Sequence, residues 1–272
     1  MRKCILYAKI KKGEHLNEET KFFIPTNDII FKLIFGTNKN EEITRSFVEF
    51  ILQKKIKNLD LDKKLELERK DQHQKQMVSD IIAEDLEGNR YIIEMQRSNK
   101  DNIISRFFGY ACSVYLKDFK VGQDYKTLKR TCMIVISENN FPGLKQTKEY
   151  HTKIEFLVKT HAEIKFENLI EMHVIELSKY KKQRAEGKKE PWLEFFTIEN
   201  EEEMMEMART QQELRAAVEQ LKLLNSDNEV KTIAMMEEWH DYMDYMHMKE
   251  ATEEAQKKGM KKRNKRAEEK KE

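Results

Sequence analysis

Apolar residues recur at helical spacing in two segments near the beginning of the chain. In "DIIFKLIFG", residues 28–36, they fall on one face, and the polar cluster at residues 25–27 offers an N-cap. In "NEEITRSFVEFILQ", residues 40–53, a similar stripe follows an acidic first turn that suits the helix dipole. We therefore predict two helices here, separated by the Gly-Thr-Asn sequence at residues 36–38.

The next segments change to strand patterns. "KKLELER", residues 63–69, alternates apolar and charged residues. "MVSDIIAEDL" and "YIIEMQ", residues 77–86 and 91–96, are joined by turn residues and predict two antiparallel strands. A helical pattern over residues 102–119 precedes the buried-strand sequence "TCMIVIS", residues 131–137. This order predicts an α/β fold with a mixed central sheet flanked by helices.

The second half of the chain contains further strands and then only helices. Residues 152–160 and 172–178 are predicted strands around a short helix at residues 162–170, and residues 181–191 form a polar hinge. Beyond the hinge, heptad-like apolar stripes pass through Met207, Leu214 and Leu221 and then through Met236 and Trp239. We predict packing or homo-oligomer contacts through these C-terminal helices.

The change of pattern at the hinge predicts how the chain is organised. Residues 1–21 are a lead, residues 22–185 form the α/β domain, and residues 191–272 form a charged, Met-rich helical extension with a basic tail.

Composition narrows the class of protein. Charged residues make up 37% of the 272 residues, and the net charge is only +2, so the total charge does not identify a partner. Three cysteines without C-x-x-C spacing argue against a disulfide framework or a zinc knuckle. The basic start lacks the apolar length of a signal peptide, and no apolar run has the length of a membrane span. We expect a cytoplasmic protein with no membrane partner.

The paired strands raise a question about chemistry. Glu94 and Gln96 are alternate residues of one strand and share a face, and Asp80 lies on its partner across the turn. Two neighbouring carboxylates repel each other unless a divalent cation lies between them. Strand-end acidic residues also commonly face solvent, so spacing alone leaves a metal site and a solvated strand end equally open.

The motifs "NDIIFKLIFG", "SDIIAEDLEGNRYIIEMQ" and "RFFGYACSVYLKDFKVGQDYKTLKRTCMIVIS" occur in this order between residues 22 and 140. They resemble those of the PD-(D/E)xK nuclease family transposases, also described as recombination-promoting nucleases. The resemblance implies a restriction-endonuclease-like core, Mg²⁺ or Mn²⁺ as cofactor, and metal-dependent cleavage of DNA by an endonuclease linked to DNA recombination or mobile elements.

Residue by residue, the resemblance makes Asp80 and Glu94 the metal carboxylates and the catalytic pair. Gln96 stands where the general motif has Lys, and an amide can orient water but cannot carry the charge of an ammonium group. Either the metal alone activates the water, or a displaced cation such as Lys100 assists. Asp28 and Arg106 match auxiliary positions, and capping of the helix by Asp28 and a structural role for Arg106 stay open.

Two other functions compete with the nuclease. A catalytically inactive nuclease fold that binds DNA or protein retains the same charge pattern. A glycosidase would use Asp80 and Glu94 as its carboxylate pair, but few aromatic residues surround them. The sequence does not indicate a cleavage-site preference, an oligomeric state or a role for the C-terminal extension.

Overall fold

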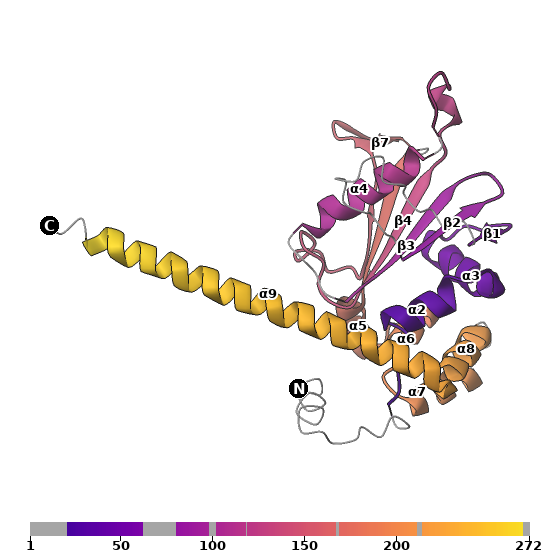
Figure 1. Ribbon diagram of the computed structural model, residues 1–272. Helices are drawn as coiled ribbons and strands as arrows, with labels where there is room; N and C mark the ends of the chain where they lie inside the picture. Colours follow the sequence, from indigo (N-terminus) through magenta and orange to yellow (C-terminus); the bar gives the residue numbers. More distant parts are fainter. Residues whose placement is uncertain are drawn as a thin grey trace.

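A mixed sheet forms the centre of the computed structural model, which describes residues 21–61, 80–97, 102–117, 119–166, 169–210 and 214–268. Within these residues the sheet has six strands in the order β1-β2-β3-β4-β8-β5 (Figure 1). The strands are β1 (Leu59–Asp60), β2 (Ile81–Asp85), β3 (Arg90–Gln96), β4 (Thr131–Ser137), β8 (Ile170–Glu176) and β5 (His151–Ile154). β3, β4 and β8 run parallel, and the other neighbours pair antiparallel.

Helices cover both faces of this sheet. One helix, α4, connects the parallel strands β3 and β4 and packs on one face, whereas α2, α3, α5 and α6 pack on the other (Figure 1). Both faces are covered, as expected for parallel strands, whose connections place helices on the sheet. These helices are α2 (Asp28–Phe35), α3 (Glu41–Leu52), α4 (Ile103–Tyr115), α5 (Leu177–Ala185) and α6 (Pro191–Phe196), with short 3₁₀ turns at η2 (Asn38–Asn40) and η3 (Tyr125–Thr127).

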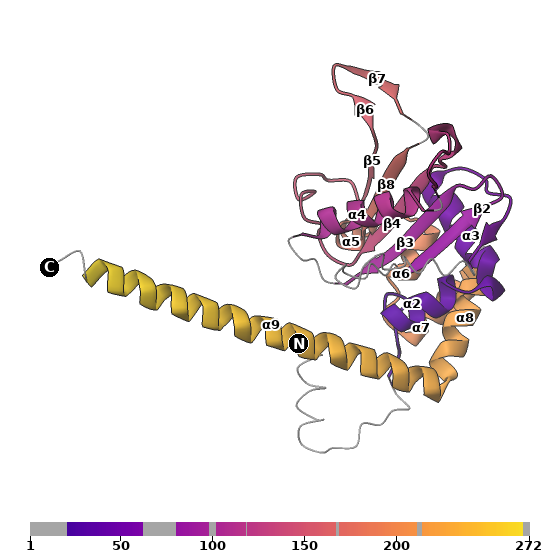
Figure 2. The same ribbon diagram turned by 45° about the horizontal axis from the view of Figure 1, so that its top comes forward.

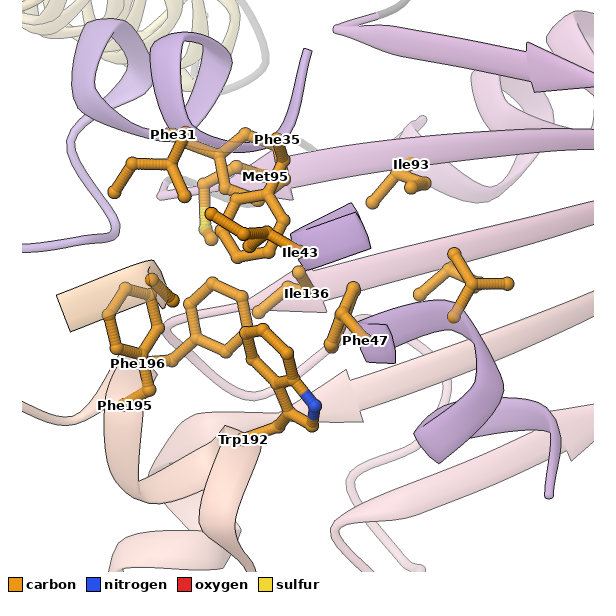
Figure 3. Close-up of a cluster of buried hydrophobic side chains, with 14 of the residues drawn as sticks. Phe31, Phe35, Ile43, Phe47, Ile93, Met95, Ile136, Trp192, Phe195 and Phe196 are labelled. Atoms are coloured by element: carbon orange, nitrogen blue, oxygen red, sulfur yellow. The ribbon is translucent and has the colours of Figure 1, made fainter. Parts of the chain in front are cut away.

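An aromatic cluster joins α6 to the two N-terminal helices. The Trp192 ring lies 5.8 Å from the ring of Phe35 and 5.5 Å from that of Phe47, measured between centroids (Figure 3). Apolar side chains of β3 and β4, including Ile93, Met95 and Ile136, complete this core (Figure 3). α6 therefore belongs to the packing that holds α2 against the sheet, although it follows the predicted hinge.

The remaining helices are α7 (Glu201–Thr210), α8 (Arg215–Ser226) and α9 (Asn228–Glu268), and α9 extends far beyond the sheet in both views (Figures 1 and 2). Of these helices, α8 and α9 pack against α2, and α7 packs against α8. Met207, Leu214, Val218 and Leu221 are buried in the same core, so the first predicted stripe is divided between two helices. The domain boundaries stay a prediction. No helix in the described ranges combines the length and apolar character of a membrane span.

Several predicted elements differ in the structure. The helix predicted over residues 162–170 is wrong, because β7 (His161–Lys165) pairs with β6 (Leu157–Val158) in an exposed hairpin (Figure 2). The single strand predicted over residues 152–160 is divided between β5 and β6, and half of the predicted hinge lies in α5. The strand predicted over residues 63–69 lies outside the described residues.

Candidate active site

Asp80 and Glu94 meet at one end of the β2–β3 hairpin. The register pairs Ile81 with Ile93, so the next position outward brings Asp80 beside Glu94. Asp80 Oδ2 accepts a hydrogen bond of 2.9 Å from the Met95 amide, and the Asp80 amide donates one of 3.2 Å to Glu94 Oε1. The turn and the two-residue period of the strands therefore bring the two carboxylates together.

Gln96 points to the same face of the sheet as Glu94, and α4 packs across that face. Arg106 on α4 donates a hydrogen bond of 2.6 Å from Nη2 to Gln96 Oε1, and its guanidinium lies 4.8 Å from the centroid of the Phe107 ring. Arg106 thus binds the amide at the motif position. Its contact fixes the orientation of the amide and brings a positive charge beside it.

Asp28 also lines the site, from the first turn of α2. The cap of this helix is Asn27, whose Oδ1 accepts hydrogen bonds from the amides of Ile29 and Ile30, so Asp28 is not needed for capping. Burial and the neighbouring charge of Asp80 raise the pKa of Asp28 to about 6. Its Oδ1 atom is buried without a hydrogen-bond partner in the described part of the chain. Asp28 therefore faces the carboxylate pair.

These residues surround an open pocket of about 210 Å³. Its lining comes from α2, the β2–β3 hairpin, α4 and α9, and consists of Asp28, Asp80, Glu94, Met95, Gln96, Arg97, Arg106, Tyr110 and Asp241. The structure therefore brings all five sequence-predicted site residues to one pocket. It adds Arg97 and Asp241, which the sequence analysis missed.

A third missed residue is Lys32, whose Nζ lies 3.1 Å from Asp80 Oδ1. Burial alone would lower the pKa of Lys32, but the ion pair with Asp80 raises it above the usual value. Helical spacing could have indicated this residue, because Lys32 follows Asp28 by one turn on α2. No comparable signal indicates Asp241, which lies more than 130 positions from the other residues of the pocket. Lys100, the displaced cation suggested by the sequence, lies outside the described residues.

The donor set of this pocket fits a hard divalent cation. Asp80 and Glu94 supply neighbouring carboxylate oxygens, which Mg²⁺ and Mn²⁺ prefer as ligands. The Lys32 ammonium group already lies against Asp80, so positive charge is favourable at this point. A bound metal ion would compete with Lys32 for the same carboxylate.

A second group of potential ligands lies on the opposite side of β4 and β8. Cys132, Glu171 and His173 place one ligand atom each within 4.8 Å of one another. Glu171 forms ion pairs with Arg130 and, at 3.4 Å, with Lys153. His173 has both ring nitrogens within 3.3 Å of protein partners. Because these atoms are already engaged, we interpret the group as a structural network.

The same network predicts how stability depends on pH. His151 Nε2 lies 2.8 Å from His173 Nδ1, and burial together with the charges of His173 and Lys153 lowers the pKa of His151 from 6.5 to about 4. Unfolded His151 takes up a proton below pH 6.5, whereas folded His151 stays neutral. The free energy of unfolding should therefore fall as the pH decreases from 7 to 5, by about 1–2 kcal/mol.

Denaturant unfolding at the two pH values measures this loss. His151→Gln should remove most of it, whereas His161→Gln, at an exposed position of β7, should leave it in place. An equal pH dependence in the parent protein and His151→Gln would contradict the assignment.

Comparison with protein families adds one finding. Residues 25–252 match the PD-(D/E)XK nuclease family transposases. The match spans both the pocket and most of the C-terminal helices. The searches of curated proteins and of solved structures returned no match.

Proposed function

The chain belongs to the PD-(D/E)XK nuclease family transposases, and on this premise we propose that it is a metal-dependent DNA endonuclease acting in recombination or in mobile elements. Membership confirms the family resemblance and the mixed α/β fold predicted from the sequence, with the restriction-endonuclease-like core that the family implies. The nuclease family supports DNA as the substrate and hydrolysis of a phosphodiester bond as the reaction.

The observation that carries the proposal is the pairing of Asp80 with Glu94 at an open pocket. The two carboxylates would hold Mg²⁺ or Mn²⁺. Such an ion, when bound, acidifies a water molecule and neutralises charge that develops on a phosphodiester. A purely structural strand end has no need for two adjacent carboxylates and a third, Asp28, facing the same space.

The other residues of the pocket have distinct parts in this proposal. The amide of Gln96, held by Arg106, would orient the attacking water by hydrogen bonding. The guanidinium of Arg106 would attract a phosphate oxygen. Lys32 would leave Asp80 when a cation binds, and its ammonium group would then pair with Asp28, whose charge also acts on it.

The proposal is tested with supercoiled plasmid DNA and the full chain. We expect nicking or linearisation with Mg²⁺ or Mn²⁺ and none with EDTA. Calorimetric titration with Mn²⁺ gives a second readout that does not depend on cleavage. Metal binding without cleavage would favour the alternative of a catalytically inactive DNA-binding module.

A third testable expectation concerns the amide at the motif position. Gln96→Ala should lower the cleavage rate by a factor of about 10²–10³, because a positioned hydrogen-bonding group is lost while both carboxylates remain. The affinity for Mn²⁺ should change little. If Arg106 acts through Gln96, the Arg106→Ala substitution should add little to Gln96→Ala in the double variant. Cleavage by Gln96→Ala at the parental rate would require another group to orient the water.

The homo-oligomer contact expected through the C-terminal helices stays a prediction. Met236 and Trp239 lie on α9 with large exposed fractions, 60% and 40%. These side chains are available to a second copy, whereas Met207 and Leu221 are used within the chain.

A further inference from the structure

The long helix α9 places the carboxylate of Glu238 among polar and cationic side chains beside the pocket. Glu238 Oε2 lies 2.5 Å from Lys21 Nζ, and Glu238 Oε1 lies 3.3 Å from Asn27 Nδ2 and 3.8 Å from Arg97 Nη2. Arg97 directly follows Gln96 and lines the pocket itself. The three donors, which we call the cradle, therefore surround one anionic group next to the candidate active site.

Each donor of the cradle has a second interaction that does not involve Glu238. Lys21 Nζ lies 4.5 Å from the centroid of the Phe23 ring, and the side chain of Asn27 caps α2 through its other atom. Arg97 Nε lies 3.8 Å from Glu138. The cradle therefore keeps its arrangement if Glu238 moves away. Such preorganisation lowers the cost of binding another anion there.

The chemistry of the cradle suits a phosphodiester. Two cationic groups and a neutral amide donor converge on oxygen atoms, as they do where proteins contact a nucleic-acid backbone. A DNA strand whose scissile phosphate reached Asp80 and Glu94 would carry a neighbouring phosphate past Arg97, because Arg97 and Glu94 line the same pocket.

In the free protein α9 makes this surface unfavourable for DNA. Glu238 fills the cradle, Asp241 lines the pocket one turn further along, and the charge of Glu237 acts on Lys32. Carboxylates at these positions repel phosphates. Ala234 on the same helix is fully buried, so movement of the Glu238 side chain alone would leave α9 anchored.

We propose that Lys21, Asn27 and Arg97 form a binding site for a DNA backbone phosphate and that Glu238 occupies this site until DNA displaces it. The proposal rests on the nuclease function proposed above and adds a regulatory contact to it. α9 then competes with DNA for the cradle, because the Glu238 carboxylate occupies the place of a phosphate.

The test is the affinity of the full chain for a fluorescent DNA duplex in EDTA, measured by anisotropy. Glu238→Gln should bind about three- to tenfold more tightly, because one ion-pair competitor is lost. The salt dependence should also steepen by about one to two units of slope, because Lys21 and Arg97 then neutralise DNA phosphates more fully and the cations condensed on those phosphates are released. Glu250→Gln removes the same charge from an exposed position of α9 and should change the affinity less than twofold.

A second pair of variants tests the cradle independently, in case Glu238→Gln does not fold. The double substitution of Lys21 and Arg97 by Gln should weaken DNA binding at least fivefold, whereas Lys249→Gln, at an exposed position, should not. If Glu238 serves only to hold α9, Glu238→Gln lowers the melting temperature and leaves DNA affinity unchanged. That result, or equal affinities for Glu238→Gln and Glu250→Gln, overturns the proposal.

Plasmid cleavage in Mg²⁺ separates this inference from the proposed function. Cleavage by the parent protein with no effect of Glu238→Gln on DNA affinity overturns the cradle and leaves the nuclease intact. Tighter DNA binding by Glu238→Gln in a protein that never cleaves supports the cradle and overturns the nuclease.

Discussion

Asp80→Asn should lose DNA cleavage by a factor of about 10³ or more and keep its fold. The substitution removes one of the two charges that would bind the metal ion, and such an ion contributes several kcal/mol to the stabilisation of the transition state. The variant should bind Mn²⁺ far more weakly. It loses the ion pair with Lys32, but the Lys32 side chain is 43% exposed, so the free energy of unfolding should change by less than about 1 kcal/mol.

Glu94→Gln should have the same effect, and Glu87→Gln supplies the control. Glu87 lies in the turn of the same hairpin, outside the pocket, and its substitution removes an equal charge. Rates of plasmid cleavage, calorimetric Mn²⁺ affinity and denaturant unfolding should be measured on all four proteins. Cleavage by Asp80→Asn at the parental rate would contradict the metal assignment, and so would a loss of activity matched by a loss of folded protein.

Trp192→Ala should destabilise the protein by about 3–5 kcal/mol. The side chain of Trp192 is only 4% exposed and packs between Phe35 and Phe47, so its removal leaves a cavity in the core that supports α2 (Figure 3). The expected cost applies although residue 192 lies beyond the predicted hinge. Denaturant unfolding followed by circular dichroism measures it.

The chain contains its own control for this experiment, because it has two tryptophans. Trp239 on α9 is 40% exposed, and Trp239→Ala should change the free energy of unfolding by less than about 1 kcal/mol. A cost for Trp192→Ala as small as that expected for Trp239→Ala would indicate that α6 is not part of the core. It would also support the domain boundary predicted near residues 185–191.

The site was predictable from the sequence where its geometry is local. The turn at residues 87–90 and the alternation along "YIIEMQ" predict a hairpin that can bring Asp80 beside Glu94, and the register in the structure does so. The sequence leaves the role of Arg106 open, because a helical pattern does not specify which strand residue the side chain meets. The structure gives the Gln96 amide as its partner.

The remaining residues depend on contacts that no local pattern encodes. Asp241 lines the pocket and Glu238 lies beside it because α9 packs along α2, which follows from the apolar residues of α8 and α9 in the shared core. The wrong helix at residues 162–170 has a physical cause as well. All residues of β7 are exposed, so its sequence lacks the apolar alternation by which a half-buried strand is recognised.

The seven residues of β3 serve two purposes at once. Tyr91, Ile93 and Met95 face the aromatic core, and Glu94 and Gln96, between and after them, face the pocket. Loss or gain of one residue inside this strand would turn a carboxylate toward the core and an isoleucine toward the pocket face. Insertions in the turn at residues 87–89 leave that alternation unchanged. A one-residue insertion in the turn should therefore preserve the pocket, whereas a one-residue insertion inside β3 should destroy both the pocket and the core.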